Sequence, residues 1–213
     1  VYIAHWDGDG FSYSEDGGHN WVRVASTDAN NLFVYEVLVD DNHPSTVYLV
    51  TASGIYSCEN PGGTSTCSLL NYGSKFVFDL ALDVKGPVND LGVTRKMYAG
   101  LQNFGIFKSQ DVGLTFGTIN KGIQANIINS LFIDPVNPSI QYASSLGRGL
   151  YKSEDNGFSW FPINDGLTDR FVNLVMSNPE NPNLLYAGTQ NYGIFTSNDG
   201  GVNWTQSNTG LSA

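Results

Sequence analysis

Cysteine, basic residues and long apolar runs are all scarce in this sequence. The chain of 213 residues has two cysteines, and its ten Lys and Arg face twenty Asp and Glu, for a net charge of −10. An acidic surface of this kind repels phosphate backbones and anionic lipid, so we expect no nucleic-acid partner. No apolar run approaches the eighteen residues of a membrane-spanning helix, so membrane insertion is not expected. Charged residues are only 14% of the chain, which argues against charge-driven disorder.

Glycine and aromatic residues are abundant instead. The chain has 24 glycines, and aromatic residues make up 13% of it. This composition favours short strands separated by many tight turns. The sequence opens with VYIAHW, without a Met or a charged and apolar leader, so we expect a mature or excised segment of a longer protein.

A short pattern, S-x-D-x-G-x-x-W, recurs at a spacing of about forty-four residues and organises the chain. A degenerate further copy begins at Ser57, and the flanking segments MYAGLQNFGIFKS, QYASSLGRGLYKS and LYAGTQNYGIFTS align without gaps. The recurring positions are Ser14, Asp16, Gly18 and Trp21; Ser109, Asp111, Gly113 and Phe116; Ser153, Asp155, Gly157 and Trp160; and Ser197, Asp199, Gly201 and Trp204.

The pattern resembles the Asp-box, also called the bacterial neuraminidase repeat. The whole chain is similar to the β-propeller family built from such repeats, which includes sialidase-type and xyloglucanase-type proteins. This resemblance implies an all-β fold: a β-propeller of about five four-stranded blades, either as an incomplete ring or as a fragment of a larger propeller. The residues agree, because a short Asp can accept amide hydrogen bonds within its own turn and Gly can adopt positive φ. We therefore interpret the recurring aspartates as structural.

The repeat phase predicts nineteen strands, one short of five complete blades. Innermost strands are expected at residues 33–40, 76–83, 127–134 and 171–178, and the missing strand is the inner strand of the first blade. Residues beyond the C-terminus would be placed to supply it. We expect one propeller domain, residues 1–213, with blades at about 1–32, 33–75, 76–126, 127–170 and 171–213.

The two cysteines, Cys58 and Cys67, both lie within the degenerate repeat. In a hairpin they would face each other, so we expect a disulfide that replaces the lost turn contacts. Such a bond indicates an oxidising compartment, and hence a secreted or cell-surface protein. The alternative is two free thiols in a cytosolic protein. Zinc is not expected, because no further Cys or suitably spaced His accompanies the pair.

Binding residues are expected on the loops opposite the repeated turns, where the family resemblance places the ligand face. Aromatic rings stack on sugars, while amides and carboxylates bond their hydroxyls. An ordinary solvated loop surface is the alternative interpretation. The candidate ligand-binding residues are His5, Trp6, Asp9, Gln102, Asn103, Phe104, Arg148, Gln190, Asn191 and Tyr192.

The evidence for catalysis and for metal binding is weaker. A glycosidase needs two carboxylates across a cleft, for which Asp7, Asp165 and Asp169 are candidates. The chain has four arginines and no sialidase signature before its first repeat. The acidic pair at residues 7 and 9 hints at calcium, but Phe11 stands where a third acidic ligand would be needed. We expect neither a metal nor a cofactor.

These observations predict a secreted or surface-exposed propeller that serves recognition or scaffolding, with a glycan or a protein as its partner. A glycoside hydrolase, or part of one, is the first alternative. The second is a structural subunit of a surface assembly, which would self-assemble through unpaired blade edges.

Overall fold

The computed structural model describes residues 1–6, 10–24, 33–59, 66–70, 75–125 and 127–211. The chain divides into two compact units, called here unit 1 (residues 1–97 and 108–117) and unit 2 (residues 98–107 and 118–213). The described residues form strands and turns, without a helix. Among them, accordingly, there is no helix of the length and apolarity needed to cross a membrane.

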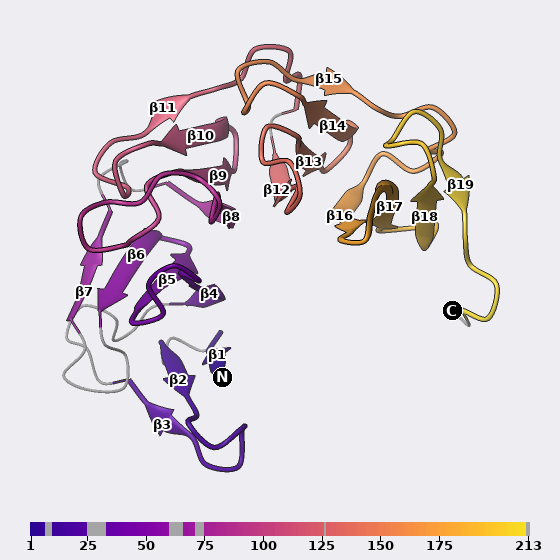
Figure 1. Ribbon diagram of the computed structural model, residues 1–213. Helices are drawn as coiled ribbons and strands as arrows, with labels where there is room; N and C mark the ends of the chain where they lie inside the picture. Colours follow the sequence, from indigo (N-terminus) through magenta and orange to yellow (C-terminus); the bar gives the residue numbers. More distant parts are fainter. Residues whose placement is uncertain (7–9, 25–32, 60–65, 71–74, 126, 212–213) are drawn as a thin grey trace. The chain divides into compact units, whose positions relative to one another are not determined.

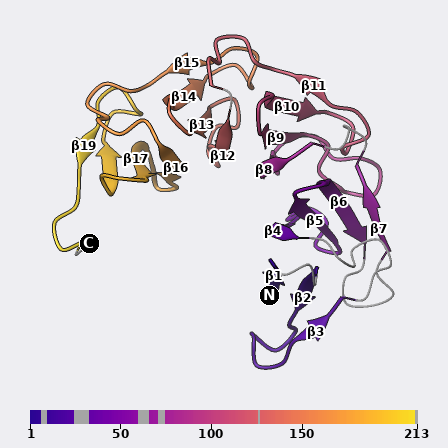
Figure 2. The same cartoon turned by 180° about the vertical axis from the view of Figure 1, so that it is seen from behind.

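Nineteen strands are found in the described residues, the number that the repeats predict. They form five sheets in which strands adjacent in the sequence are neighbours in the sheet (Figures 1 and 2). The first sheet contains β1 (Tyr2–Ala4), β2 (Phe11–Tyr13) and β3 (Val22–Arg23). The second contains β4 (Val34–Val39), β5 (Thr46–Thr51), β6 (Gly54–Glu59) and β7 (Thr66–Leu69).

The remaining sheets have four strands each. The third contains β8 (Val77–Leu82), β9 (Met97–Leu101), β10 (Gly105–Ser109) and β11 (Gly117–Thr118). The fourth contains β12 (Ile128–Ile133), β13 (Gln141–Ser145), β14 (Gly149–Ser153) and β15 (Phe161–Pro162). The fifth contains β16 (Val172–Asn178), β17 (Asn181–Thr189), β18 (Ile194–Ser197) and β19 (Thr205–Gln206). The first sheet alone has three strands, as expected.

The core lies between adjacent sheets. In unit 1, Phe11 of β2 and Val47 of β5 belong to one buried apolar cluster, which also includes Cys58. In unit 2, Leu150 and Trp204 belong to another, which joins the fourth and fifth sheets. In the second sheet the second strand is the most buried, because its side chains are covered on both faces; every residue of β5 is buried.

The repeated Ser-x-Asp-x-Gly segments form tight turns held by their own side chains. In the copy after β10, Ser109 Oγ donates a hydrogen bond to Asp111 Oδ1 (2.7 Å) and accepts one from the Gly113 amide (2.9 Å). The other three copies repeat these contacts. In the last copy, bonds from the backbone and side chain of Asn203 lower the pKa of Asp199 to about 2. These carboxylates are engaged within their own turns.

The degenerate repeat has the expected disulfide in place of such a turn. Cys58 of β6 and Cys67 of β7 are directly opposite in the antiparallel register and are joined by a disulfide. Both residues are buried in the cluster between the first two sheets. The bond therefore links β6 and β7, the last two strands of the second sheet, within the apolar cluster that this sheet shares with the first sheet.

Removing this bond should destabilise the fold. The loop it closes spans nine residues, for which the chain-entropy relation predicts a loss of roughly 2–3 kcal/mol. Denaturant unfolding with and without a reductant measures this loss. The double variant Cys58→Ser/Cys67→Ser is the control, because the reductant should not change its midpoint. Equal midpoints for the oxidised and reduced protein would contradict the prediction.

Candidate functional site

Four aromatic side chains of unit 1 form a continuous row across three sheets. Trp6 follows β1, Tyr35 lies on β4, and Phe76 and Phe78 lie just before and on β8. The ring centroids are 4.6 Å apart for Trp6 and Tyr35, 5.3 Å for Tyr35 and Phe76, and 4.9 Å for Phe76 and Phe78. Trp6 is 68% exposed at the end of the row. We call these four residues the aromatic row.

A β-bulge accompanies the row in β4. The register of β4 against β5 shifts between Val34 and Glu36, which leaves Tyr35 as the extra residue. A bulge of this kind bends the strand locally and changes the direction in which the neighbouring side chains point. The inner strands β12 and β16 have the same irregularity at Asn129 and Asn173. The bulge thus recurs in the repeat. An aromatic residue stands at this position in unit 1, whereas unit 2 has asparagine there.

A pair of carboxyl groups lies on β4 and β8, each one residue after a ring of the aromatic row. Glu36 is the third residue of β4, Asp79 is the third residue of β8, and the two side chains are hydrogen-bonded. Burial, together with the charge and hydrogen bond of Asp79, raises the pKa of Glu36 to about 9. Glu36 Oε2 is buried without a hydrogen-bond partner among the described residues. The pair therefore retains one proton at neutral pH.

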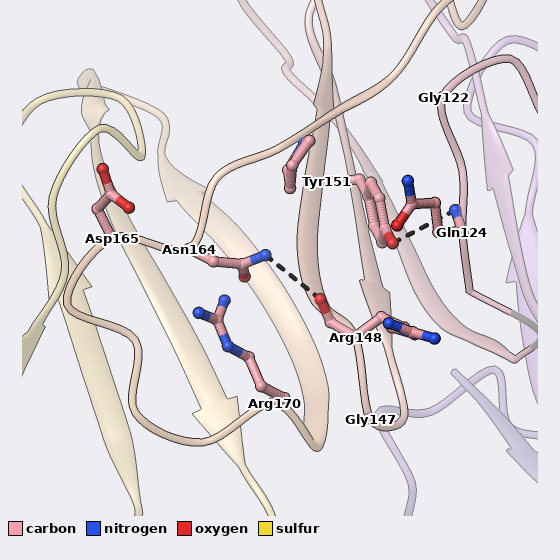
Figure 3. A pocket seen from close by; sticks show the side chains of 9 residues that line it. Gly122, Gln124, Gly147, Arg148, Tyr151, Asn164, Asp165 and Arg170 are labelled. Carbon is pink, nitrogen blue, oxygen red and sulfur yellow. Dashed lines mark hydrogen bonds between the residues drawn. The ribbon is translucent and has the colours of Figure 1, made fainter.

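Unit 2 contains a separate polar pocket of about 400 Å³ (Figure 3). It is formed by the loop between β13 and β14, the loop between β15 and β16, and a segment before β12. Its volume lies in the range usual for small-molecule sites. The lining residues are Gly122, Gln124, Gly147, Arg148, Tyr151, Pro162, Asn164, Asp165 and Arg170.

Hydrogen bonds between main chain and side chain fix the two loops of the pocket. Asn164 Oδ1 accepts a bond from the Leu150 amide (2.8 Å), and its Nδ2 donates to the Arg148 carbonyl (3.3 Å). The Arg170 carbonyl accepts bonds from the amides of Gly147 (2.8 Å) and Gly149 (2.9 Å). Gly149 has a φ of +78°, and a Cβ there would collide with the Asn164 side chain. The backbone carrying both arginines is thereby held in place.

The two arginines occupy different parts of the pocket. Figure 3 shows Arg170 near Asn164 and Asp165, and Arg148 extending toward the side of Gln124. Both arginines are exposed. Within the part of the chain that the structure describes, neither guanidinium has a carboxylate at ion-pair distance. With two guanidinium groups and one carboxylate, Asp165, the pocket lining has a net positive charge.

The residues expected to bind a ligand do not gather in one place. Trp6 belongs to the aromatic row, whereas Arg148 lines the pocket together with the acidic candidate Asp165. Asp7 and Asp9 lie outside the described residues. The others lie on separate loops or strand ends: His5, Gln102, Asn103, Phe104, Gln190, Asn191 and Tyr192.

Asp169 is committed to backbone hydrogen bonds. It is 3% exposed, and its carboxylate accepts bonds from the amides of Phe171 (2.9 Å) and Asn191 (2.8 Å). Burial tends to raise the pKa of Asp169, but the bonds from these two residues outweigh burial and leave the pKa below its ordinary value. The carboxylate thus connects the start of β16 to the loop between β17 and β18.

Several residues of these two sites were not identified from the sequence. Tyr35 and Phe78 occupy the repeat position that holds Asn129 and Asn173 in later copies, a departure that aligning the inner strands would have exposed. Glu36 and Asp79 depart from the repeat in the same way. Nothing in the sequence marks Gln124 or Tyr151 as pocket residues.

Comparison with known proteins identifies the fold. No protein-family model matches the chain, and no curated protein matches its sequence. Solved structures do match. An ancestral GH74 enzyme aligns with a TM-score of 0.76 at 20% identity, over 100% of this chain and 30% of that one. The GH74 enzyme of Niastella koreensis aligns with a TM-score of 0.74 at 22% identity, over 92% and 34% of the two chains.

A third match comes from a different functional class. The extracellular domain of a hybrid two-component system from B. thetaiotaomicron aligns with a TM-score of 0.69 at 15% identity, over 92% of this chain and 25% of that one. The chain thus spans about a third or less of each of these proteins. Identities this low establish the fold alone, and the protein is a β-propeller.

Stability should fall with rising pH because of the carboxyl pair. Between the ordinary glutamate pKa and about 9, the folded state holds one proton more than the unfolded state, so the free energy of unfolding decreases as pH rises. Glu36→Gln keeps a hydrogen-bond donor but has no proton to lose. We expect it to stabilise the protein at pH 8 by on the order of 1 kcal/mol.

Urea unfolding between pH 5 and 9 tests this. The matched control is Glu180→Gln, which removes the same charge from an exposed position. A wild-type stability that does not depend on pH over this interval, or the same slope in both variants, would refute the shared proton.

Proposed function

We propose that this β-propeller is an extracellular carbohydrate-binding protein whose aromatic row holds a saccharide. The observation that carries the proposal is the row itself: four rings in edge or tilted contact across three sheets, with Trp6 68% exposed at one end. The exposed face of the Trp6 ring is free to contact a ligand. A sugar ring offers a flat apolar face for such a side chain.

Three further observations support the proposal. Tyr35 and Phe78 of the row directly precede Glu36 and Asp79 on β4 and β8, and the carboxyl pair could accept hydrogen bonds from hydroxyl groups or donate to them. The Cys58–Cys67 disulfide favours an oxidising compartment. The structural neighbours include GH74 enzymes and an extracellular domain. We also propose that the five blades correspond to residues 1–32, 33–75, 76–126, 127–170 and 171–213, each of which contains the strands of one sheet.

A glycoside hydrolase is the second candidate, and the protonated Glu36 favours it as a source of a general acid. The geometry of the pair is unfavourable for this role. Glycosidases separate their two carboxyls by about 5–10 Å, so that a glycosidic bond or a water fits between them. Glu36 and Asp79 are hydrogen-bonded to each other, which leaves no such gap. Binding without turnover is therefore the function that the geometry supports best.

Trp6→Ala should weaken saccharide binding about tenfold, because the exposed ring supplies the stacking surface. Glycan-array screening identifies the ligand, and titration calorimetry then compares its affinity for the variants. Phe158→Ala, at an aromatic residue of unit 2 that is 66% exposed, is the control and should bind as the wild type does. An affinity that is the same for Trp6→Ala and the wild type would exclude the row as the binding site.

A further inference from the structure

We propose that the pocket of unit 2 is a second binding site, specific for acidic saccharides, in which Arg148 and Arg170 recognise carboxylates of uronic-acid residues. The inference extends the proposed function from saccharides in general to acidic saccharides. It rests on the ligand being a saccharide, but not on the aromatic row, because the two sites are in different units.

The charge of the pocket is opposite to that of the protein. The chain has a net charge of −10, and two lysines outside the pocket form ion pairs: Lys96 with Asp83 at 3.3 Å and Lys152 with Glu154 at 2.9 Å. The two pocket arginines have no such partner among the described residues, although Asp165 lines the same pocket. Unpaired cations in a hollow of an acidic protein attract an anion from solution.

Hydrogen bonds hold the backbone of the loops that carry these two arginines. Asn164 bonds the backbone on both sides of Gly149, and the Arg170 carbonyl takes amide bonds from Gly147 and Gly149. A fixed backbone reduces the entropy lost when a ligand orders the side chains. The planar guanidinium matches a carboxylate with two parallel hydrogen bonds, which an ammonium group does not.

The other lining groups suit the hydroxyl groups of a sugar. The Gln124 side chain and the Asp165 carboxylate offer hydrogen-bonding groups for hydroxyls. Tyr151 is 3% exposed and its hydroxyl is near the Gln124 amide (3.4 Å), so its ring offers little apolar surface. Arginines also recognise acidic peptides. Tighter binding of an acidic peptide is therefore one outcome of the test below.

Titration calorimetry on the whole chain tests the proposal with two matched ligands. One is a trimer of galacturonic acid, and the other is its methyl ester, which has the same backbone without the charges. We expect the acid to bind more tightly than the ester and its affinity to fall with added salt. Arg148→Ala and Arg170→Ala should each weaken its binding by about tenfold.

The control is Arg95→Ala, which removes the same charge from an exposed position of unit 1 and should leave the affinity unchanged. Arg148→Lys and Arg170→Lys keep the charge but lose the planar fork, and should bind with intermediate affinity. Circular dichroism of each variant establishes that it is folded.

Equal affinities for the acid and the ester would overturn the proposal, as would tighter binding of an acidic peptide or no binding at all. Acid binding that is equally strong in both alanine variants would overturn the role of the arginines. The outcomes also separate the two proposals. If Trp6→Ala weakens binding of a neutral saccharide while the acid does not bind, the aromatic row stands and the acidic site falls. If acid binding depends on the arginines while Trp6→Ala changes no affinity, the reverse holds.

Discussion

The pocket of unit 2 depends on one asparagine that bonds the backbone of a neighbouring loop through both ends of its amide. Asn164 accepts from the Leu150 amide and donates to the Arg148 carbonyl. Asn120 makes the equivalent pair of bonds with Ile106 and Phe104, and Asn208 makes them with Ile194 and Tyr192. The same asparagine-bonded loop therefore recurs in the third, fourth and fifth sheets. The loop of the fourth sheet differs in carrying an exposed arginine, Arg148, where the others have Phe104 and Tyr192.

Much of the fold could be predicted because the repeat fixes the local structure. The inner strands expected at residues 33–40 and 171–178 are Val34–Val39 and Val172–Asn178. Each begins where an apolar run follows a polar stretch of sequence. The cysteine pair was predictable for the same reason, since the phase of the repeat places Cys58 and Cys67 opposite each other in a hairpin. Short-range patterning is sufficient for these features.

The sites could not be predicted because they depend on contacts between distant segments. The sequence suggests an exposed acid at Asp169, yet its carboxylate accepts hydrogen bonds from the amides of Phe171 and Asn191. The pocket brings together Gln124, Arg148 and Arg170 from three segments that no local pattern connects. The most regular carboxylates in the sequence are the recurring turn aspartates, and their hydrogen bonds lie within their own turns. The repeat therefore does not point to these sites.

Some residues of β4 and β8 differ from those at the equivalent positions of β12 and β16, and the shared strand structure does not require them. A buried carboxyl oxygen without a partner is unfavourable, and Glu36 has one. Unit 2 forms the same bulged inner strand with Ser130 and Leu174 at the equivalent positions, so the strand does not require an acid there. The same holds for the rings of Tyr35 and Phe78, which are replaced by Asn129 and Asn173. Local rules of folding are most often broken at functional sites. The unpartnered oxygen of Glu36 is consistent with the proposed function, since the hydroxyl groups of a saccharide could supply the missing partner.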